Sequence, residues 1–185
     1  DTNSRAGKEV PIWKLEQRFI EPVRNVLAER YEVDAQESLE DCLLNVAVTF
    51  VNDNYQDYLA ELMEAKAGSL LEKLDEDNTR LQMLTALSYS VGYMLHIRSG
   101  LPGRAYFGNS LDKVCNFNTP EVISILGAAV SDMSEVLLRE IAVLVQDLQR
   151  EERNQNRTFE VPADSRYDVN RTATTEGSAE YGSDL

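Results

Sequence analysis

The strongest periodic pattern of apolar side chains lies between residues 78 and 100. No residue between Arg80 and Arg98 carries a fixed charge, and apolar positions recur at three- and four-residue spacing, which predicts a helix. The apolar stripe consists of Leu81, Leu84, Leu87, Val91 and Leu95. Because the other face also carries Met and Tyr side chains, this helix is expected to be wrapped by neighbouring elements.

Both ends of this central helix carry capping residues. Asn78 or Thr79 can cap its first turn through a side-chain oxygen. Gly100, followed closely by Pro102, supplies the usual stop. The predicted helix therefore occupies the stretch between Asn78 and Gly100.

Further helical patterns precede the central helix. Pro22 is expected at the first position of a helix over residues 21–32. Ser38 begins the next helix in the sequence SLED, which is close to a capping box. The NDN sequence at 52–54 interrupts or bends the periodicity, and the helical stripe that follows is expected to end at Gly68.

A short helix and a loop are predicted on the two sides of the central helix. Ser69 and Glu72 form the pattern of a capping box at the start of the sequence SLLEKL. Residues 101–118 are rich in Gly and Asn, which is typical of a loop. The side chains expected to anchor this loop on the core are Tyr106, Phe107, Leu111, Val114 and Phe117.

The clearest helix start in the chain is the sequence Thr119, Pro120 and Glu121. It combines a capping hydroxyl, a proline at the first helical position and a carboxylate near the positive end of the helix dipole. Gly127, or the pair Ser131 and Asp132, is expected to kink the helix or restart it. The apolar face beyond that point consists of Met133, Leu137, Ile141, Leu144 and Leu148.

These patterns predict an all-α protein with a single helical domain of five or six helices. At 185 residues the chain is long enough for one domain with a sizeable core. We expect residues 1–20 to be a linker or the end of a preceding domain, with a short extended segment at Val10 to Trp13. The helical domain is expected at 21–152, and residues 153–185 have the polar composition of a flexible acidic tail.

The charge balance argues against direct binding of nucleic acid. The chain has 32 acidic and 18 basic residues, which gives a net charge of -14. Phosphate backbones are bound by clustered Lys and Arg, and this chain has no such cluster. We therefore expect this segment to make no direct contact with DNA or RNA.

The two cysteines and the start of the chain bear on its location. Cys42 and Cys115 lie in apolar surroundings, so we expect buried free thiols rather than a disulfide. The chain has no pattern typical of a signal peptide, and its central apolar stretch contains too many polar residues for a membrane span. A cytoplasmic protein is expected. Because the chain begins at Asp1 without a methionine, it is expected to be part of a longer polypeptide.

Side chains with catalytic or metal-binding potential do not form a recognisable motif. The lone histidine, His96, is flanked by Leu95 and Ile97, so we expect a packed residue rather than a metal ligand. Without a second histidine, a triad for acyl transfer is unsupported, and the sequence contains neither a phosphate-binding loop nor GxGxxG. We therefore predict no catalytic residue, no metal site and no cofactor.

Carboxylates and tyrosines recur at helical spacing, and they leave open a catalytic, cation-binding or nucleic-acid-binding site. Carboxylates could bind a cation or act as acid and base, although on amphipathic helices they usually form the solvated face. Tyrosines could stack on bases, but without interleaved Arg or Lys they are better interpreted as core. The carboxylates are Glu37, Glu40, Asp41, Glu61, Glu64, Glu72, Asp75 and Glu76, and the tyrosines are Tyr55, Tyr58, Tyr89 and Tyr93.

Several separated strings carry a family resemblance. They are DTNSRAGKEVPIW, DYLAELMEAKAGSLLEKLDEDN, FNTPEVISILGAAVSDMSEVLLREI, and the tail strings NRTF and EYGSDL. Together they resemble one segment of the very large multidomain proteins of conjugative mobile elements in Firmicutes, which combine an ArdC-like antirestriction region, a Swi/Snf-type helicase and a DNA methylase. The resemblance implies that residues 1–13 close an ArdC-like single-strand DNA-binding domain and that residues 153–185 lead to the next domain.

A second similarity is to the zinc peptidase part of the ArdC-like family. There a helix bearing HExxH precedes a second ligand helix, and CLLNVAV at 42–48 and YSVGY at 89–93 have similar apolar spacing. Leu44, Asn45 and Val48 stand where the motif has His, Glu and His, so the resemblance implies a degenerate peptidase without its metal ligands. If it holds, Leu44 and Val48 should be buried against the helix of Tyr89. A shared hydrophobic pattern between two unrelated core helices explains the same spacing.

The sequence and the resemblance allow two alternative functions from different classes. The first is a non-enzymatic helical spacer or docking module within a mobile-element DNA-processing protein, whose partners are neighbouring domains of the same polypeptide or another protein. The second is a metal-dependent hydrolase or nucleic-acid-modifying domain that uses the clustered carboxylates.

Overall fold

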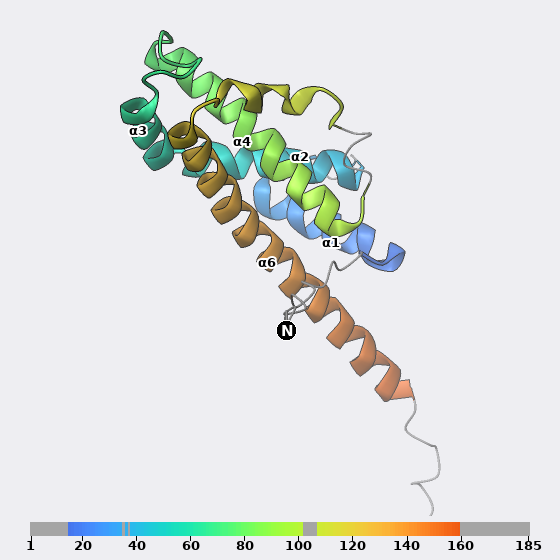
Figure 1. Ribbon diagram of the computed structural model, residues 1–185. Helices are drawn as coiled ribbons and strands as arrows, with labels where there is room; N and C mark the ends of the chain where they lie inside the picture. Colours follow the sequence, from blue (N-terminus) through green and yellow to red (C-terminus); the bar gives the residue numbers. More distant parts are fainter. Residues whose placement is uncertain (1–14, 35, 37, 102–106, 160–185) are drawn as a thin grey trace, which may run out of the picture. The chain divides into compact units, whose positions relative to one another are not determined.

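The computed structural model describes residues 15–34, 36, 38–101 and 107–159, and it places side chains in these ranges as far as residue 155. Every regular element in this part of the chain is helical (Figure 1), which confirms the predicted all-α class. The elements are α1 (Gln17–Tyr31), α2 (Leu39–Asn54), α3 (Gln56–Ala65), α4 (Glu76–Ser99), the 3-10 helix η1 (Ser110–Asn116) and α6 (Pro120–Phe159). The segment at Val10 to Trp13, the loop residue Tyr106 and the tail from residue 160 lie outside the described residues.

The chain divides into two units, Asp1–Leu148 and Gln149–Leu185. The first unit holds the helical core. Of the second unit, the structure describes only the residues that end α6, so the helix continues past residue 152, where the sequence suggested a tail. None of the described helices is both long enough and apolar enough to cross a membrane.

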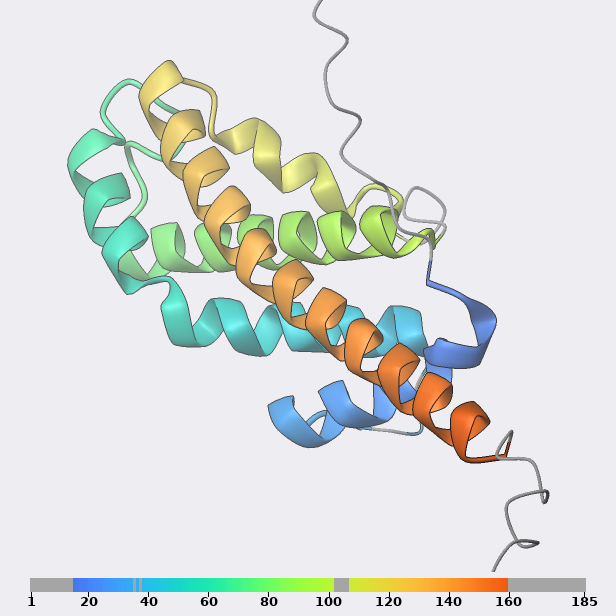
Figure 2. The same ribbon diagram turned by 90° about the horizontal axis from the view of Figure 1, so that it is seen from below.

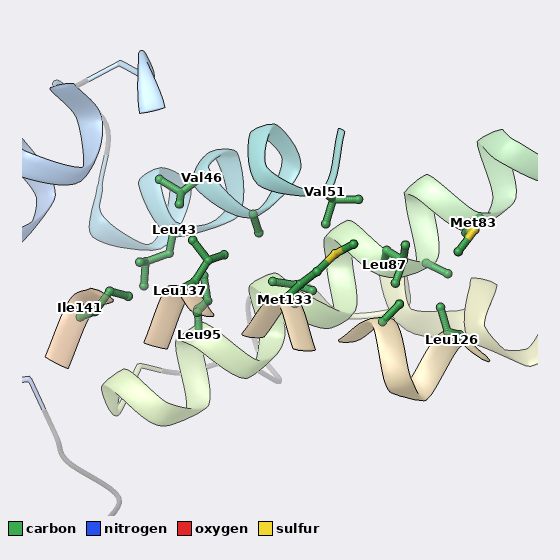
Figure 3. Close-up of a cluster of buried hydrophobic side chains, with 14 of the residues drawn as sticks. Leu43, Val46, Val51, Met83, Leu87, Leu95, Leu126, Met133, Leu137 and Ile141 are labelled. Carbon is green, nitrogen blue, oxygen red and sulfur yellow. The ribbon is translucent and has the colours of Figure 1, made fainter. Parts of the chain in front are cut away.

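Helix α4 is central to the first unit, and its inner face agrees with the predicted stripe at Leu87, Val91 and Leu95 but not at Leu81. Met83, Leu87 and Leu95 are fully buried, whereas Leu81 is 60% exposed. The stripe is therefore shifted at its start from Leu81 to Met83, and both positions fit a helical repeat because both faces of this helix carry apolar residues. Leu43 and Val46 of α2 lie close to this face in the core (Figure 3).

Asp75 caps α4, so the predicted caps Asn78 and Thr79 were wrong. The Asp75 carboxylate accepts a hydrogen bond from the Asn78 backbone at 2.8 Å, and an ionised carboxylate also favours the positive end of the helix dipole. Thr79 is buried within the first turns. At the other end, Gly100 has φ 76° and ends the helix as predicted, because this left-handed conformation favours glycine.

Pro22 lies inside α1 rather than at its first position. The helix begins five residues earlier, at Gln17, so one turn precedes the proline. The ring removes the helical hydrogen bond that a residue at this position would donate to the carbonyl of Arg18. Phe19, Val23 and Leu27 are buried, and this burial offsets the lost bond.

Two side-chain patterns mark the boundaries of α2 and α3. The Ser38 hydroxyl accepts a hydrogen bond from the Asp41 backbone at 3.1 Å, which confirms the predicted cap of α2. At the other end, the side chains of Asn52 and Asn54 donate to the carbonyls of Val48 and Phe50. The helix then stops at Asn54, and α3 starts two residues later.

Residues Ser69 to Leu74 form turns, so the predicted short helix was wrong. The Ser69 hydroxyl accepts from the Leu71 backbone at 3.1 Å, which closes a tight turn instead of a helical cap. Glu72 accepts a hydrogen bond from the backbone of Gly68, one residue before the position that a capping box requires. The hydrogen-bonding groups of the motif are present, but they stabilise a turn.

Helix α6 starts at Pro120, as predicted, and continues without a break through Gly127, Ser131 and Asp132. These three residues are exposed, so they impose no packing constraint that would bend the helix. The buried positions keep a single helical phase along the first unit. They are Val122, Ile125, Leu126, Ala129, Met133, Ser134, Leu137 and Ile141. This part of α6 crosses α2 and α4 obliquely (Figure 2).

Candidate functional site

The side of α6 next to Arg30 and Tyr31 of α1 carries two parallel rows of side chains. Residues four apart on a helix form a ridge, and neighbouring ridges enclose a groove. The first ridge consists of Arg139, Val143 and Asp147, and the second of Val136, Glu140 and Leu144. With Arg30 of α1, these side chains line a groove of about 370 Å³.

The groove is partly apolar. Val136 is 50% exposed and Val143 is 52% exposed, seven residues apart on the same helix. The apolar face predicted for this helix was the inner one, so neither valine was recognised as a surface feature. The signal was present in the sequence, because two valines at a seven-residue interval beside the buried stripe place apolar surface on the flank of the helix.

Glu140 is held in place from α1. Its carboxylate accepts a hydrogen bond from the Tyr31 hydroxyl at 2.7 Å and also pairs with Arg30. Burial raises the pKa of the Tyr31 hydroxyl, and the bond to Glu140 raises that pKa further. These contacts fix one wall of the groove to the helical core.

A second tyrosine makes the same kind of contact from α3. The Tyr58 hydroxyl donates to Asp132 of α6 at 2.7 Å. This hydrogen bond, together with burial and the charge of Asp132, raises the pKa of Tyr58 to about 12. Two carboxylates of α6 are thus bound by tyrosines from two different helices.

We expect these tyrosines to make the protein unstable at high pH. In the folded protein the pKa of Tyr58 is raised from 10.0 to about 12. Tyr58 therefore contributes fully to the free energy of unfolding below its unfolded-state pKa, and this contribution is lost as the pH rises through the folded-state pKa. The free energy of unfolding, measured by urea titration, should fall across this interval. It should fall less in Tyr58→Phe and in Asp132→Asn. An identical pH dependence in wild type and both variants would contradict this assignment.

The lone histidine is packed, as predicted, inside an aromatic cluster. His96 is fully buried, and its ring lies edge-on to Phe107 with 4.8 Å between centroids. Tyr89 and Tyr93 also meet Phe107 edge-on. The Nδ1 atom of His96 lies 2.7 Å from the Gly92 carbonyl oxygen. Burial lowers the pKa of His96, and the backbone bond to Gly92 opposes that shift.

The predicted burial of Leu44 and Val48 is only partly observed. Helices α2 and α4 do pack together, and the Cδ1 atom of Leu44 lies 3.0 Å from where a Cβ at Gly92 would stand. Leu44 is half-buried, but Val48 is 37% exposed, so its expected burial was wrong. The two residues are four apart but differ by about 40° around the helix, which is enough to turn Val48 towards solvent.

The two cysteines differ in environment. Both are free thiols, as expected. Cys42 is buried, whereas Cys115 on η1 is exposed, so the expectation of burial was wrong for Cys115. Phe107 and Phe117 anchor this stretch on the core instead.

The carboxylates do not converge in the described residues. Glu61, Glu64, Glu72, Asp75 and Glu76 are exposed, and Glu37 lies outside the described residues. Among the residues that the structure describes, no group of three or more His, Cys, Asp and Glu side chains is placed to hold a metal ion. The tyrosines predicted as core, Tyr55, Tyr58, Tyr89 and Tyr93, are all half-buried.

Comparisons with known proteins found no matching family model, no similar curated protein and no similar solved structure.

Proposed function

We propose that this chain is a non-enzymatic helical module that serves as a spacer or docking surface in a large DNA-processing protein of a mobile element, acting in the cytoplasm. The observation that supports docking is the groove on α6. It presents two half-exposed valines between charged side chains, on a helix whose other face is buried in the core. Apolar surface rimmed by charge is typical of protein interaction sites.

The mobile-element context of this proposal is supported by the sequence strings alone. In that context the partner is a neighbouring domain of the same polypeptide or another protein. The rigid attachment of α6 suits such a role. Glu140 and Asp132 are each bound by a tyrosine from another helix, so the surface is preformed before a partner arrives.

Substitution of an exposed valine tests the docking role. Val143→Asp should weaken binding to an adjoining domain or to a second copy by about tenfold or more, because it places a charge at the centre of the apolar surface. Ile123→Asp is the matched control, since Ile123 is 41% exposed on another part of α6. A chain that binds neither adjoining domains nor itself would contradict the proposal.

The alternative is a metal-dependent hydrolase or nucleic-acid-modifying domain that uses carboxylates. This alternative is supported by the sequence pattern only. Isothermal titration with magnesium, manganese and zinc distinguishes the two. Defined stoichiometry and tight binding would support the metal-dependent alternative and weaken the docking proposal.

A further inference from the structure

The first ridge of α6 carries opposite charges at equal distances on either side of its central valine, Val143. Arg139 precedes Val143 by four residues, and Asp147 follows it by four. All three side chains are exposed and line the groove. A ridge with opposite charges at equal distances from an apolar centre is complementary to itself when a second copy runs in the opposite direction.

We propose that the partner of this groove is a second copy of the same chain, which packs its α6 antiparallel across this one with Val143 at the two-fold axis. The inference rests on the proposed docking role and names the occupant. Ridges of residues four apart run at an angle to the helix axis, and two such ridges become parallel when helices cross at about -50°, the commonest packing angle. In that crossing, Arg139 of each copy lies beside Asp147 of the other.

The two-fold axis brings the Val143 side chains of the two copies into contact, with the pairs of opposite charges on either side of them. Arg139 is paired with Glu135 of its own helix in an exposed ion pair, which is easily exchanged for a contact with the second copy.

The size of this surface predicts a weak dimer. A stable, specific interface buries about 1,200 Å² or more in total, and a single crossing of two helices through half-exposed valines falls below that area. Each chain also carries a net charge of -14, which opposes pairing. Association is therefore expected to be weak, as in transient complexes that bury less than about 1,200 Å².

Charge exchange tests the arrangement by sedimentation equilibrium. Arg139→Asp and Asp147→Arg should each weaken association by about tenfold, because two favourable pairs become two like-charge pairs. The double variant R139D/D147R restores both pairs and should associate like wild type. Lys113→Asp, an exposed change of the same charge on η1, is the control and should have a much smaller effect.

Cysteine cross-linking tests the axis. With Cys115 replaced by serine, Val143→Cys should form a disulfide between copies on oxidation, because the two-fold axis brings the two residues 143 together. Ser124→Cys, also exposed on α6, should cross-link far less. Equal cross-linking at both positions would overturn the proposed axis.

Four results separate this inference from the docking role. A wild type that stays monomeric at about 1 mM, a concentration that detects even very weak association, would overturn the pairing, as would a double variant that fails to recover. If the chain stays monomeric while Val143→Asp weakens binding to an adjoining domain, the pairing falls and the docking role stands. Recovery in the double variant, with cross-linking at residue 143, supports both.

Discussion

Leu137→Ala is expected to lower the free energy of unfolding by about 3 kcal/mol, because it removes a fully packed side chain and leaves a cavity. Leu137 is 1% exposed and lies on the inner face of α6. Figure 3 shows it close to Leu43 of α2 and Leu95 of α4. Its loss therefore weakens the contact between the helix that carries the groove and the two helices beneath it.

The neighbouring residue provides the control for this prediction. Val136→Ala is on the same helix but half-exposed, so it should change the free energy of unfolding by less than about 0.5 kcal/mol. Urea titrations of the two variants measure the difference. Similar losses at both positions would mean that α6 does not bury the face assigned to it.

Gly92→Leu is expected to cost about 2 to 3 kcal/mol through overpacking. A Cβ atom at residue 92 would lie 3.0 Å from the Cδ1 atom of Leu44 and 3.3 Å from the Cζ atom of Phe107. Phe107 belongs to the aromatic cluster around His96, and Leu44 is half-buried, so the further atoms of a leucine would have to displace both side chains. Glycine is therefore required here for the close approach of α2 to α4, although it weakens the helix itself.

Gly127→Leu is the matched control for this substitution. Gly127 is also helical, but no atom lies within 4 Å of its Cβ position. The exchange should stabilise the protein by up to about 1 kcal/mol, because leucine has the higher helix propensity. Adding Leu44→Ala to Gly92→Leu should recover part of the lost stability. If both glycine variants were stabilised, the close packing at Gly92 would be wrong.

The fold class followed from local patterns, because helix caps and apolar periodicity are determined by residues close in sequence. Ser38, Gly100 and Pro120 were each assigned their correct roles at helix ends. One error, at the start of α4, arose where two nearby residues could serve equally well. Asp75 and Asn78 are both good caps, and the geometry of the preceding turn decides between them.

Other features depend on tertiary contacts that no local pattern reveals. Tyr31 meets Glu140, and Tyr58 meets Asp132, across 109 and 74 residues of sequence. The exposure of Val48 and Cys115 depends on which face of a helix is covered, and the sequence alone did not fix that choice. In α6 the predicted buried stripe is confirmed from Met133 to Ile141, whereas Leu144 and Leu148 are only half-buried. Only the packing of the helix identifies Val136 and Val143 as surface residues.

The most direct test of the docking role is the solvent accessibility of the valine methyl groups, measured by NMR with a soluble paramagnetic agent. The comparison is between the isolated chain at low concentration and the intact parent polypeptide. We predict that Val136 and Val143 are accessible in the isolated chain, as their exposure requires, and protected in the intact protein, while Ile123 changes little. Equal accessibility of both valines in the two samples would contradict the account.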